Sequence, residues 1–377
     1  MKTALTLFAL LILTAPALAL AQRDISFMNE LQRSADRGIA SLKASQNPEG
    51  WWTSPEHPAV TALALIAWQG NPNKPKQTPK WIEKGYNFLL THVQPDGSIY
   101  VPGKGLANYN TSLCMMALLA ANDKKHNPAL LKARAFLAKQ QWDLGEKGKQ
   151  DHPLDGGVGY GGRYPHSDLN NTLSSLEALH FTRHLVKDAP PQDDLNWKAA
   201  IGFIQNCQNL PSHNKQPWAS NDPKQKGGMI YFPGKSMAGA VKNKNGKTAL
   251  RSYGSISYAG MMSYSYARLK ADDPRVVAVR KWLFDNFTLE ENPAMGAQGL
   301  YYYYYLMAKA LSFSGDRTIT VKGKEIDWRK TLGLKLIGLQ QQDGSWVNSK
   351  SARWWESEKP LVTAYSVIAL SYIYRGE

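Results

Sequence analysis

The sequence predicts an all-α protein, an (α/α)6 toroid in which six inner helices are enclosed by six outer helices. Two observations predict it: several helical segments carry almost no charge, and an amphipathic helix lies upstream of each one. A helix that is apolar on nearly every face has to be buried on nearly every side. Repeated helix pairs can stack as an open solenoid or close into a ring. The uncharged helices favour the ring, because a solenoid leaves one layer of helices facing water.

The predicted inner helices share a motif, in which Thr is followed after five residues by Ala and a large apolar residue. Four copies occur, at Thr61…Ala67-Trp68, Thr111…Ala117-Leu118, Thr172…Ala178-Leu179 and Thr363…Ala369-Leu370. They predict inner helices over 58–69, 109–121, 168–186 and 360–374. Two further pairs lack the Thr and complete the six: outer 194–207 with inner 253–269, and outer 274–287 with inner 296–313.

The outer helices are expected to end in Gln, before a turn that contains Gly and a large apolar residue. The clear copies are Gln46 to Trp52, Gln94 to Ile99 and Gln342 to Trp346, with looser copies at Gln140–Trp142 and Gln205–Gln208. Gly suits the left-handed conformation that ends a helix, and the Gln amide can bond carbonyls left free there.

The N-terminal 21 residues have the pattern of a signal peptide. Lys2 precedes an apolar run over 4–13, and Ala19-Leu20-Ala21 supplies the small residues that signal peptidase accepts. We therefore expect a signal peptide over 1–21 and one toroid domain over 22–377, with long loops at 143–166 and 209–252, exported to the periplasm or the cell exterior. An uncleaved anchor is the alternative. Export argues against ATP- or NAD-dependent chemistry, so no cofactor is expected.

The Gln342-Asp-Gly344-Ser-Trp346 turn, the small-residue inner helices and the six helix pairs resemble the squalene/terpene cyclase and protein prenyltransferase β-subunit superfamily. The resemblance covers about residues 30–374 and implies a central cavity for an isoprenoid. Squalene–hopene-type cyclases place an acidic Asp in the middle of Asp-x-Asp-Asp. The matching stretch here is Asp168-Leu169-Asn170-Asn171, and the amide of Asn170 cannot supply a proton. This departure argues against ordinary cyclisation.

The prenyltransferase zinc site is not expected. That site needs Asp two residues before a Cys, whereas Ser112 precedes Cys114 and Gln205 precedes Cys207. The last inner helix contains no His, so no metal is expected. Cys114 and Cys207 fall in different units, and we expect two free, buried thiols.

His166 and Asp168 are the candidate catalytic residues, as an acid/base pair at the entry of an inner helix. The alternative is that Ser167 or Asp168 is an ordinary N-cap of that helix, and that the asparagines bond neighbouring backbone groups. Tyr301–Tyr305 occupy five consecutive positions and so surround a helix, which puts some of them on a cavity. The candidate substrate-binding residues are Asn170, Asn171, Tyr109, Tyr253, Tyr258, Tyr301, Tyr302, Tyr305 and Trp51.

The chain has 45 Lys and Arg against 30 Asp and Glu, a net charge of +15. Eight of the basic residues and one Asp lie in the 209–252 loop, which could attract an anionic membrane surface or an acidic glycan. Nucleic acid is disfavoured because no groove-entering motif is present. The leading hypothesis is an exported terpene-cyclase-like toroid that binds an isoprenoid or another hydrophobic small molecule or lipid.

The alternatives are a secreted carbohydrate-active (α/α)6 enzyme acting on an acidic glycan and a non-catalytic binding module. The sequence leaves open whether the chain is an enzyme. If it is one, terpene-cyclase-like chemistry of the isomerase or transferase class is favoured over a polysaccharide lyase. The oligomeric state is also left open.

Overall fold

The computed structural model describes residues 24–376 except 163, 188–193, 243–245 and 247. The predicted signal peptide over 1–21 lies outside the described residues. Within them there are twelve α-helices, and none has the length and apolar character needed to cross a membrane. The inner helices are α2 (Pro58–Gly70), α4 (Ala107–Ala120), α6 (Leu169–Phe181), α8 (Gly254–Tyr266), α10 (Leu300–Phe313) and α12 (Lys359–Arg375). The outer helices are α1 (Ile25–Ala44), α3 (Lys80–Thr91), α5 (Asn127–Ala138), α7 (Trp197–Asn206), α9 (Pro274–Asp285) and α11 (Trp328–Leu339).

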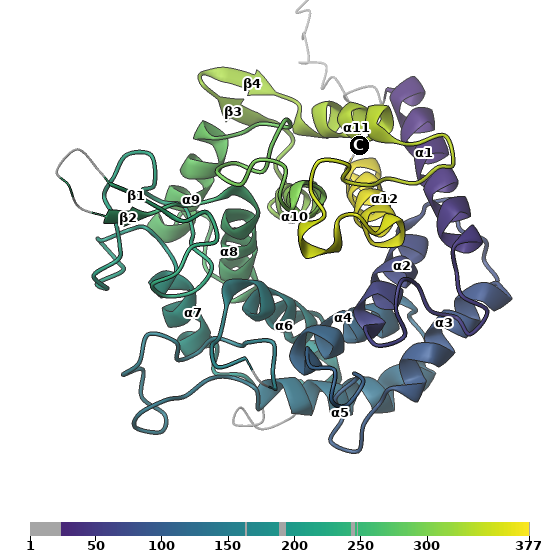
Figure 1. Ribbon diagram of the computed structural model, residues 1–377, viewed down its shortest axis with the longest axis horizontal. Coiled ribbons are helices and arrows are strands. Elements are labelled where there is room, and N and C mark those ends of the chain that lie inside the picture. Colours follow the sequence, from purple (N-terminus) through teal and green to yellow (C-terminus); the bar gives the residue numbers. More distant parts are fainter. Residues whose placement is uncertain (1–23, 163, 188–193, 243–245, 247, 377) are drawn as a thin grey trace, which may run out of the picture.

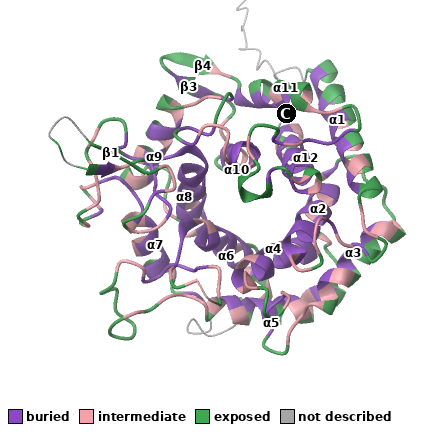
Figure 2. Cartoon of the chain, viewed as in Figure 1, coloured by how far each residue is buried: buried purple, intermediate pink, exposed green. Residues whose placement is uncertain are grey.

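The inner helices form a closed ring, in which each packs against the next and α12 packs against α2 (Figure 1). The outer helices surround this ring, and the inner helices are buried along most of their length (Figure 2). Every residue of α8 except Ser265 is buried, which its Gly, Ser and Ala positions permit because small side chains let neighbouring helices approach closely. The predicted all-α (α/α)6 toroid is confirmed.

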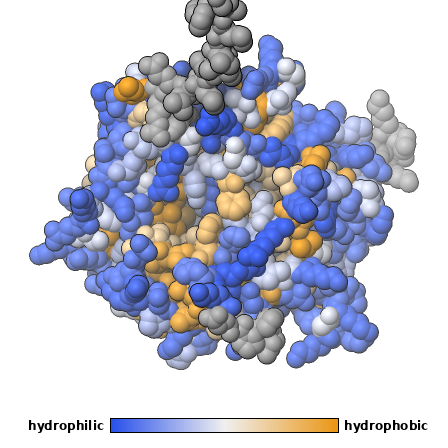
Figure 3. All heavy atoms as spheres, turned by 180° about the vertical axis from the view of Figure 1, so that it is seen from behind, coloured by the Kyte–Doolittle hydropathy of each residue, from blue (hydrophilic) through white to orange (hydrophobic). Residues whose placement is uncertain are grey.

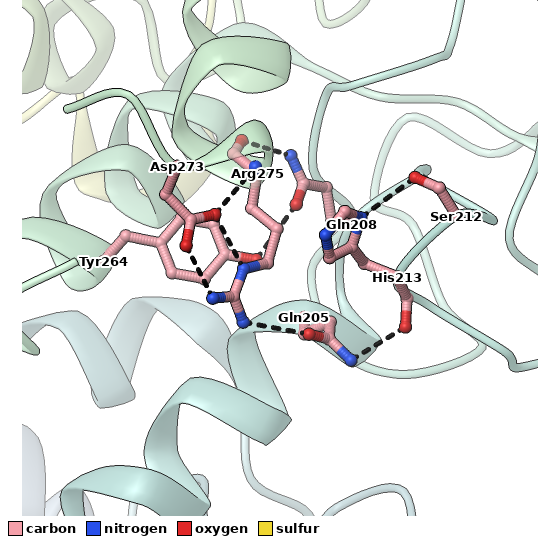
Figure 4. A network of polar contacts seen from close by, with 7 residues as sticks. All are labelled: Gln205, Gln208, Ser212, His213, Tyr264, Asp273 and Arg275. Atoms are coloured by element: carbon pink, nitrogen blue, oxygen red, sulfur yellow. Dashed lines mark hydrogen bonds and ion pairs between the residues drawn. The ribbon is translucent and has the colours of Figure 1, made fainter. Parts of the chain in front are cut away.

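The glutamines after the outer helices join consecutive repeats. Gln340 Nε2 donates to the carbonyl of Gly344 in its own turn and to the carbonyl of Ser34 in α1, both at 2.9 Å. Gln208 Nε2 bonds the carbonyls of Gly227 and Arg275 in the same way, and its Oε1 accepts from the Tyr264 hydroxyl at 3.0 Å (Figure 4). The sequence pattern pointed to Gln342, but Gln340 makes this bridge, since it directly follows the last helical residue.

The Thr of the repeated motif fixes each turn to the inner helix that follows. Thr363 Oγ1 accepts from the Trp346 amide at 3.1 Å, and Thr61, Thr111 and Thr172 bond the equivalent amides. In α8, which lacks the Thr, Ser257 accepts from the Met229 amide at 3.0 Å. The Thr of the motif is therefore explained by a hydrogen bond from the turn amide to its hydroxyl, and Ser can replace Thr in this role.

Glycine is required where a turn meets the next outer helix. Gly344 has φ +80°, and a Cβ there would overlap the carbonyl oxygen of Arg37 in α1. Gly156 has φ +86°, and a Cβ there would overlap the carbonyl oxygen of Ala199 in α7. Any larger residue would be strained and would also push two repeats apart.

The largest boundary differences from the sequence prediction are at α10 and α6, and two hairpins were not predicted. α10 begins at Leu300 rather than 296, because Gly296 and Gly299 have positive φ and end the preceding turn. α6 ends at Phe181 and a 3₁₀ turn follows over Arg183–Leu185, so the helix does not reach 186. The hairpins were not predicted, because strands this short leave little pattern in a sequence. They pair β1 (Ala240–Lys242) with β2 (Thr248–Leu250), and β3 (Ile319–Val321) with β4 (Lys324–Ile326), both antiparallel.

Candidate functional site

A cavity of about 390 Å³ lies where the N-terminal ends of the inner helices meet. All six inner helices contribute to it at or next to their first turn. The contributing residues are His57, Leu106, Asn170, Tyr253, Tyr302 and Leu361. Ala59, Val60, Leu63 and Ile256 add aliphatic surface. The volume falls within the roughly 300–1,000 Å³ that is usual for small-molecule sites.

Tyrosine is the dominant side chain on the cavity wall. Four of these tyrosines come from the inner helices or their caps, and three come from the loops. They are Tyr109, Tyr253, Tyr302 and Tyr365, and Tyr160, Tyr164 and Tyr231. Burial raises the pKa of Tyr109, Tyr253, Tyr302 and Tyr365 above the usual value of 10, so these phenols stay neutral. The wall therefore presents uncharged aromatic rings with a few hydroxyl groups.

Four of the candidate residues from the sequence lie on this wall: Asn170, Tyr109, Tyr253 and Tyr302. The Tyr302 hydroxyl donates a hydrogen bond to Asn170 Oδ1, which joins α10 to α6 across the cavity. Asn170, which matches the cyclase acid in the sequence comparison, thus faces the cavity. Its side chain is an amide, and it already accepts a hydrogen bond from the Tyr302 hydroxyl.

The other aromatic candidates lie outside the lining. Tyr258 packs against Tyr303 with ring centroids 5.7 Å apart, and Tyr301 packs against Tyr304. Tyr305 is one layer deeper, where its ring stacks on that of Tyr365 at 5.2 Å. Trp51 lies in the turn before α2, and its indole N–H donates to Glu49. Sequence position alone did not show which face of each helix points inward.

Asp168 is the N-cap of α6 and is sealed behind the cavity wall. Its Oδ1 accepts the backbone amides of Asn170 at 3.0 Å and Asn171 at 2.9 Å, and its Oδ2 accepts Asn171 Nδ2 at 2.7 Å. The side chain is fully buried, and this burial raises its pKa to about 7. Its polar contact with Tyr231, a wall residue, lowers the pKa. Asp168 and Asn171 therefore stabilise the helix start, as the capping alternative anticipated.

His166 does not form a pair with Asp168. Its ring stacks on Phe232, with centroids 4.5 Å apart and an interplanar angle of 24°. Its Nδ1 is buried and has no hydrogen-bond partner among the described residues. The two candidate catalytic residues thus contact different groups, and neither is part of the cavity lining.

Glu356 is a functional candidate that the sequence analysis missed. It precedes α12, is 1% exposed and lies on the cavity wall. Among the described residues that line the cavity it carries the one carboxyl, and no Lys or Arg lines the cavity with it. An acidic residue shortly before a helix is an ordinary capping signal, so the sequence did not distinguish Glu356 from any other N-terminal carboxylate.

The segment before Glu356 is strained and forms part of the mouth. Trp354 and Trp355 have φ of 56° and 65°, and both residues are more than two-fifths exposed. Bulky residues rarely adopt this left-handed conformation. Trp355 makes an edge contact with His57, the residue before α2, with ring centroids 5.0 Å apart. The segment thus holds two indole rings at the entrance and directs Glu356 inward.

The long connection between α7 and α8 contributes apolar side chains to the cavity. Tyr231 and Met237 of this connection line it. The two ends of the connection are tied by Asn209 Nδ2, which donates to Ser252 Oγ at 3.0 Å. The Lys and Arg residues described in this connection are absent from the lining, so its basic charge belongs to the outer surface.

The opposite end of the ring is filled rather than open. Lys309 Nζ lies 2.5 Å from the Glu177 carboxylate and 3.0 Å from the Tyr305 hydroxyl, and all three side chains are buried. At the helix ends, Phe181 and Phe313 meet edge to face and are partly exposed. Figure 3 shows the molecule from behind, with hydrophobic side chains gathered around the middle of that face within a polar border.

No family model matches the chain, and no curated protein matches it in sequence. Among solved structures, it is similar to a variant of type II terpene cyclase MstE from Scytonema in the apo state. The TM-score is 0.56 and the identity 13%, covering 94% of this chain and 100% of that one. A second MstE variant, in complex with its substrate geranylgeranyl dihydroxybenzoate, gives a TM-score of 0.55 at 13% identity over the same shares. A protein from Actinoplanes gives 0.51 at 11% identity, covering 92% of this chain and 99% of that one. At these identities the likeness shows the fold, and it confirms the predicted resemblance to terpene-cyclase-like toroids.

Proposed function

We propose that the chain is an exported toroid that binds an isoprenoid or another hydrophobic ligand in its aromatic cavity. One observation carries the proposal: tyrosine rings, aliphatic side chains and two entrance tryptophans make up most of the wall, and no Lys or Arg is among the described lining residues. Such a wall gains free energy by removing apolar ligand surface from water, about 25 cal/mol per Å². The MstE variant that contains a geranylgeranyl substrate supports this ligand class by analogy of fold alone.

Cyclase-type catalysis by the candidate pair is not supported by the geometry. Asn170 occupies the wall position, and Asp168 lies behind it with its carboxylate already accepting three N–H groups. An acidic glycan is the weaker alternative ligand, because uronates need cationic partners and the described lining supplies none. The basic 209–252 loop keeps an anionic membrane surface as a further proposed partner, on the outside of the molecule.

Native mass spectrometry of the purified mature chain mixed with a bacterial lipid extract tests the proposal. We expect a bound apolar molecule of defined mass, and quenching of tryptophan fluorescence when it is titrated back. Met237→Asp puts a charge at the cavity wall and should weaken binding at least tenfold, because the carboxylate would have to be desolvated by an apolar ligand. Val277→Asp on the exposed face of α9 is the matched control and should bind as the wild type does. Equal affinities of both variants would place the ligand elsewhere.

A further inference from the structure

Glu356 is a buried carboxyl that lacks an ion-pair partner in the described part of the chain. The other buried glutamate on the ring, Glu177, is paired with Lys309 at 2.5 Å. An isolated buried carboxylate is costly, and such a group usually takes up a proton instead. The position of Glu356 on the cavity wall makes that proton available to a bound molecule.

Hydrogen bonds hold the Glu356 carboxyl in one place. Oε1 accepts from the Tyr302 amide at 2.8 Å, in the first turn of the 14-residue helix α10. Oε2 accepts from Asn348 Nδ2 at 2.6 Å, and the backbone N–H of Asn348 also donates to the backbone carbonyl of Glu356 at 2.9 Å. A carboxyl group fixed in this way loses little entropy when it binds a ligand.

The surroundings of Glu356 shift its protonation toward neutral pH, so that the protonated form is favoured below about pH 7. Burial raises its pKa to about 7, although the hydrogen bonds from Asn348 and the backbone amides of α10 act in the opposite direction. Three phenols interact with the Glu356 carboxyl, namely Tyr301 and Tyr304 on α10 and Tyr365 on α12. His57 at the entrance has a lowered pKa because of burial, so it is neutral over the same range.

A second polar group on the wall has an unused donor. Asn110 is fully buried in α4 and lines the cavity, and its Oδ1 accepts from the Ala59 amide at 3.1 Å. That bond fixes the orientation of the amide, which leaves Nδ2 without a hydrogen-bond partner in the described structure. A buried donor without an acceptor costs about 1–3 kcal/mol, and a ligand oxygen would remove this cost.

We propose that the cavity selects hydrophobic ligands that carry an uncharged oxygen acceptor, such as a ketone, ester or ether, and that Asn110 and protonated Glu356 donate hydrogen bonds to such oxygens. The inference rests on the proposed function and narrows its ligand class. It disfavours a diphosphate head group in the cavity, because no Lys or Arg is among the described lining residues to pair with the anion. It also disfavours a pure hydrocarbon, which would leave both donors unpaired.

The pH dependence follows from the protonation state. A ligand oxygen that accepts from Glu356 binds the protonated form, so affinity is constant well below the pKa of Glu356 and falls as pH rises through it. The fall is at most tenfold per pH unit. His57 and the phenols hold their charge between pH 7 and 9, but Asp168 behind the wall also has a pKa of about 7. Comparison of Glu356→Gln with Asp168→Asn therefore assigns a change in that window to one carboxyl or the other.

Fluorescence titration with three probes that share a farnesyl tail tests the inference. The ketone farnesylacetone, the hydrocarbon farnesene and farnesyl diphosphate are compared at pH 6 and pH 9. At pH 6 we expect farnesylacetone to bind at least tenfold more tightly than the other two, and to lose most of that advantage at pH 9. Asn110→Asp keeps the acceptor for the Ala59 amide but removes the donor, and should reduce the ketone preference about tenfold.

Glu356→Gln should retain the ketone preference and abolish its pH dependence, because an amide donates at both pH values. In Glu356→Gln the new Nε2 could face Asn348 Nδ2, which is also a donor. If the single variant does not fold, the double variant Asn348→Asp with Glu356→Gln restores a donor–acceptor pair and is used in its place. Glu358→Gln, which removes a nearby carboxyl outside the lining, should behave as the wild type. Equal binding of farnesene and farnesylacetone, tighter binding of the diphosphate, or affinity that rises with pH would each overturn the inference while the cavity remains a hydrophobic site. Binding of none of the three probes, together with no lipid in native mass spectra, would reject the proposed function itself.

Discussion

Two carboxyl groups at the starts of inner helices have the same raised pKa and different surroundings. Burial raises the pKa of Asp168, beside α6, and of Glu356, beside α10, to about 7 in both cases. Asp168 precedes its own helix and is enclosed by that helix and Tyr231, whereas Glu356 reaches α10 from the segment before α12 and lies on the cavity wall. A perturbed pKa therefore indicates burial in both, and access to the cavity distinguishes a structural group from a binding group.

The largest effect is expected from removing Asp168. Asp168→Ala leaves the amides of Asn170 and Asn171 and the side chain of Asn171 without an acceptor. We expect the free energy of unfolding to fall by about 3 kcal/mol, from the lost cap and the buried unpaired donors. Chemical denaturation at pH 6 measures it. The preference for farnesylacetone over farnesene should stay within threefold of the wild type, and a larger loss would make Asp168 part of the ligand site.

The next effect is a change in how stability depends on pH. In the unfolded chain Asp168 loses its proton near pH 3.8, and in the folded chain near pH 7, so the folded state binds more protons between these values. Stability should therefore decrease as pH rises from about 4 to 7, by at most about 1.4 kcal/mol per pH unit, and level off above it. Asp168→Asn should remove this part of the slope. Glu356 contributes a slope of the same sign, which Glu356→Gln should remove.

Denaturation curves at half-unit pH intervals test this directly. The two single variants should each flatten part of the wild-type slope, and a combined variant should flatten more than either one. An unchanged dependence of stability on pH in Asp168→Asn would contradict the comparison of the two carboxyls. It would mean that the pKa of Asp168 is not raised in the folded state.

The ring could be predicted from the sequence because its repeats carry local hydrogen-bond signatures. The Thr of the motif bonds a turn amide, and a glutamine after the outer helix bonds the following repeat. Both residues therefore recur at similar positions in successive repeats of the sequence. Burial on all sides also shows directly as an absence of charge. Errors occurred where glycines with positive φ delay a helix, as before α10, and where a 3₁₀ turn replaces the expected end of α6. The strands of three residues were missed.

The cavity was predicted only in part, because its lining combines residues that are far apart in the chain. Five consecutive tyrosines on α10 were known to surround the helix, but only Tyr302 lies on the wall. Glu356 reaches the site through a backbone bend at Trp354 and Trp355. The hydrophobic periodicity of the sequence does not predict such a bend. The loop residue Tyr231 was hidden within a segment noted only for its positive charge.

The smallest effect is expected at the strained entrance, where the stability cost and the binding role can be separated. Trp354→Gly removes a bulky residue from a left-handed conformation, which should stabilise the fold by up to about 1 kcal/mol before the lost packing of the indole is subtracted. The net change in unfolding free energy should stay within about 1 kcal/mol of zero, while farnesylacetone binds three- to tenfold more weakly. Thr53→Gly is the matched control, since Thr53 also has a positive φ, of 62°, and lies outside the cavity lining. It should gain stability without changing affinity, because strain is relieved there and no ligand contact is lost. If both variants bound the ketone as the wild type does, the indole of Trp354 would be a surface group, and Glu356 alone would connect this segment to the ligand.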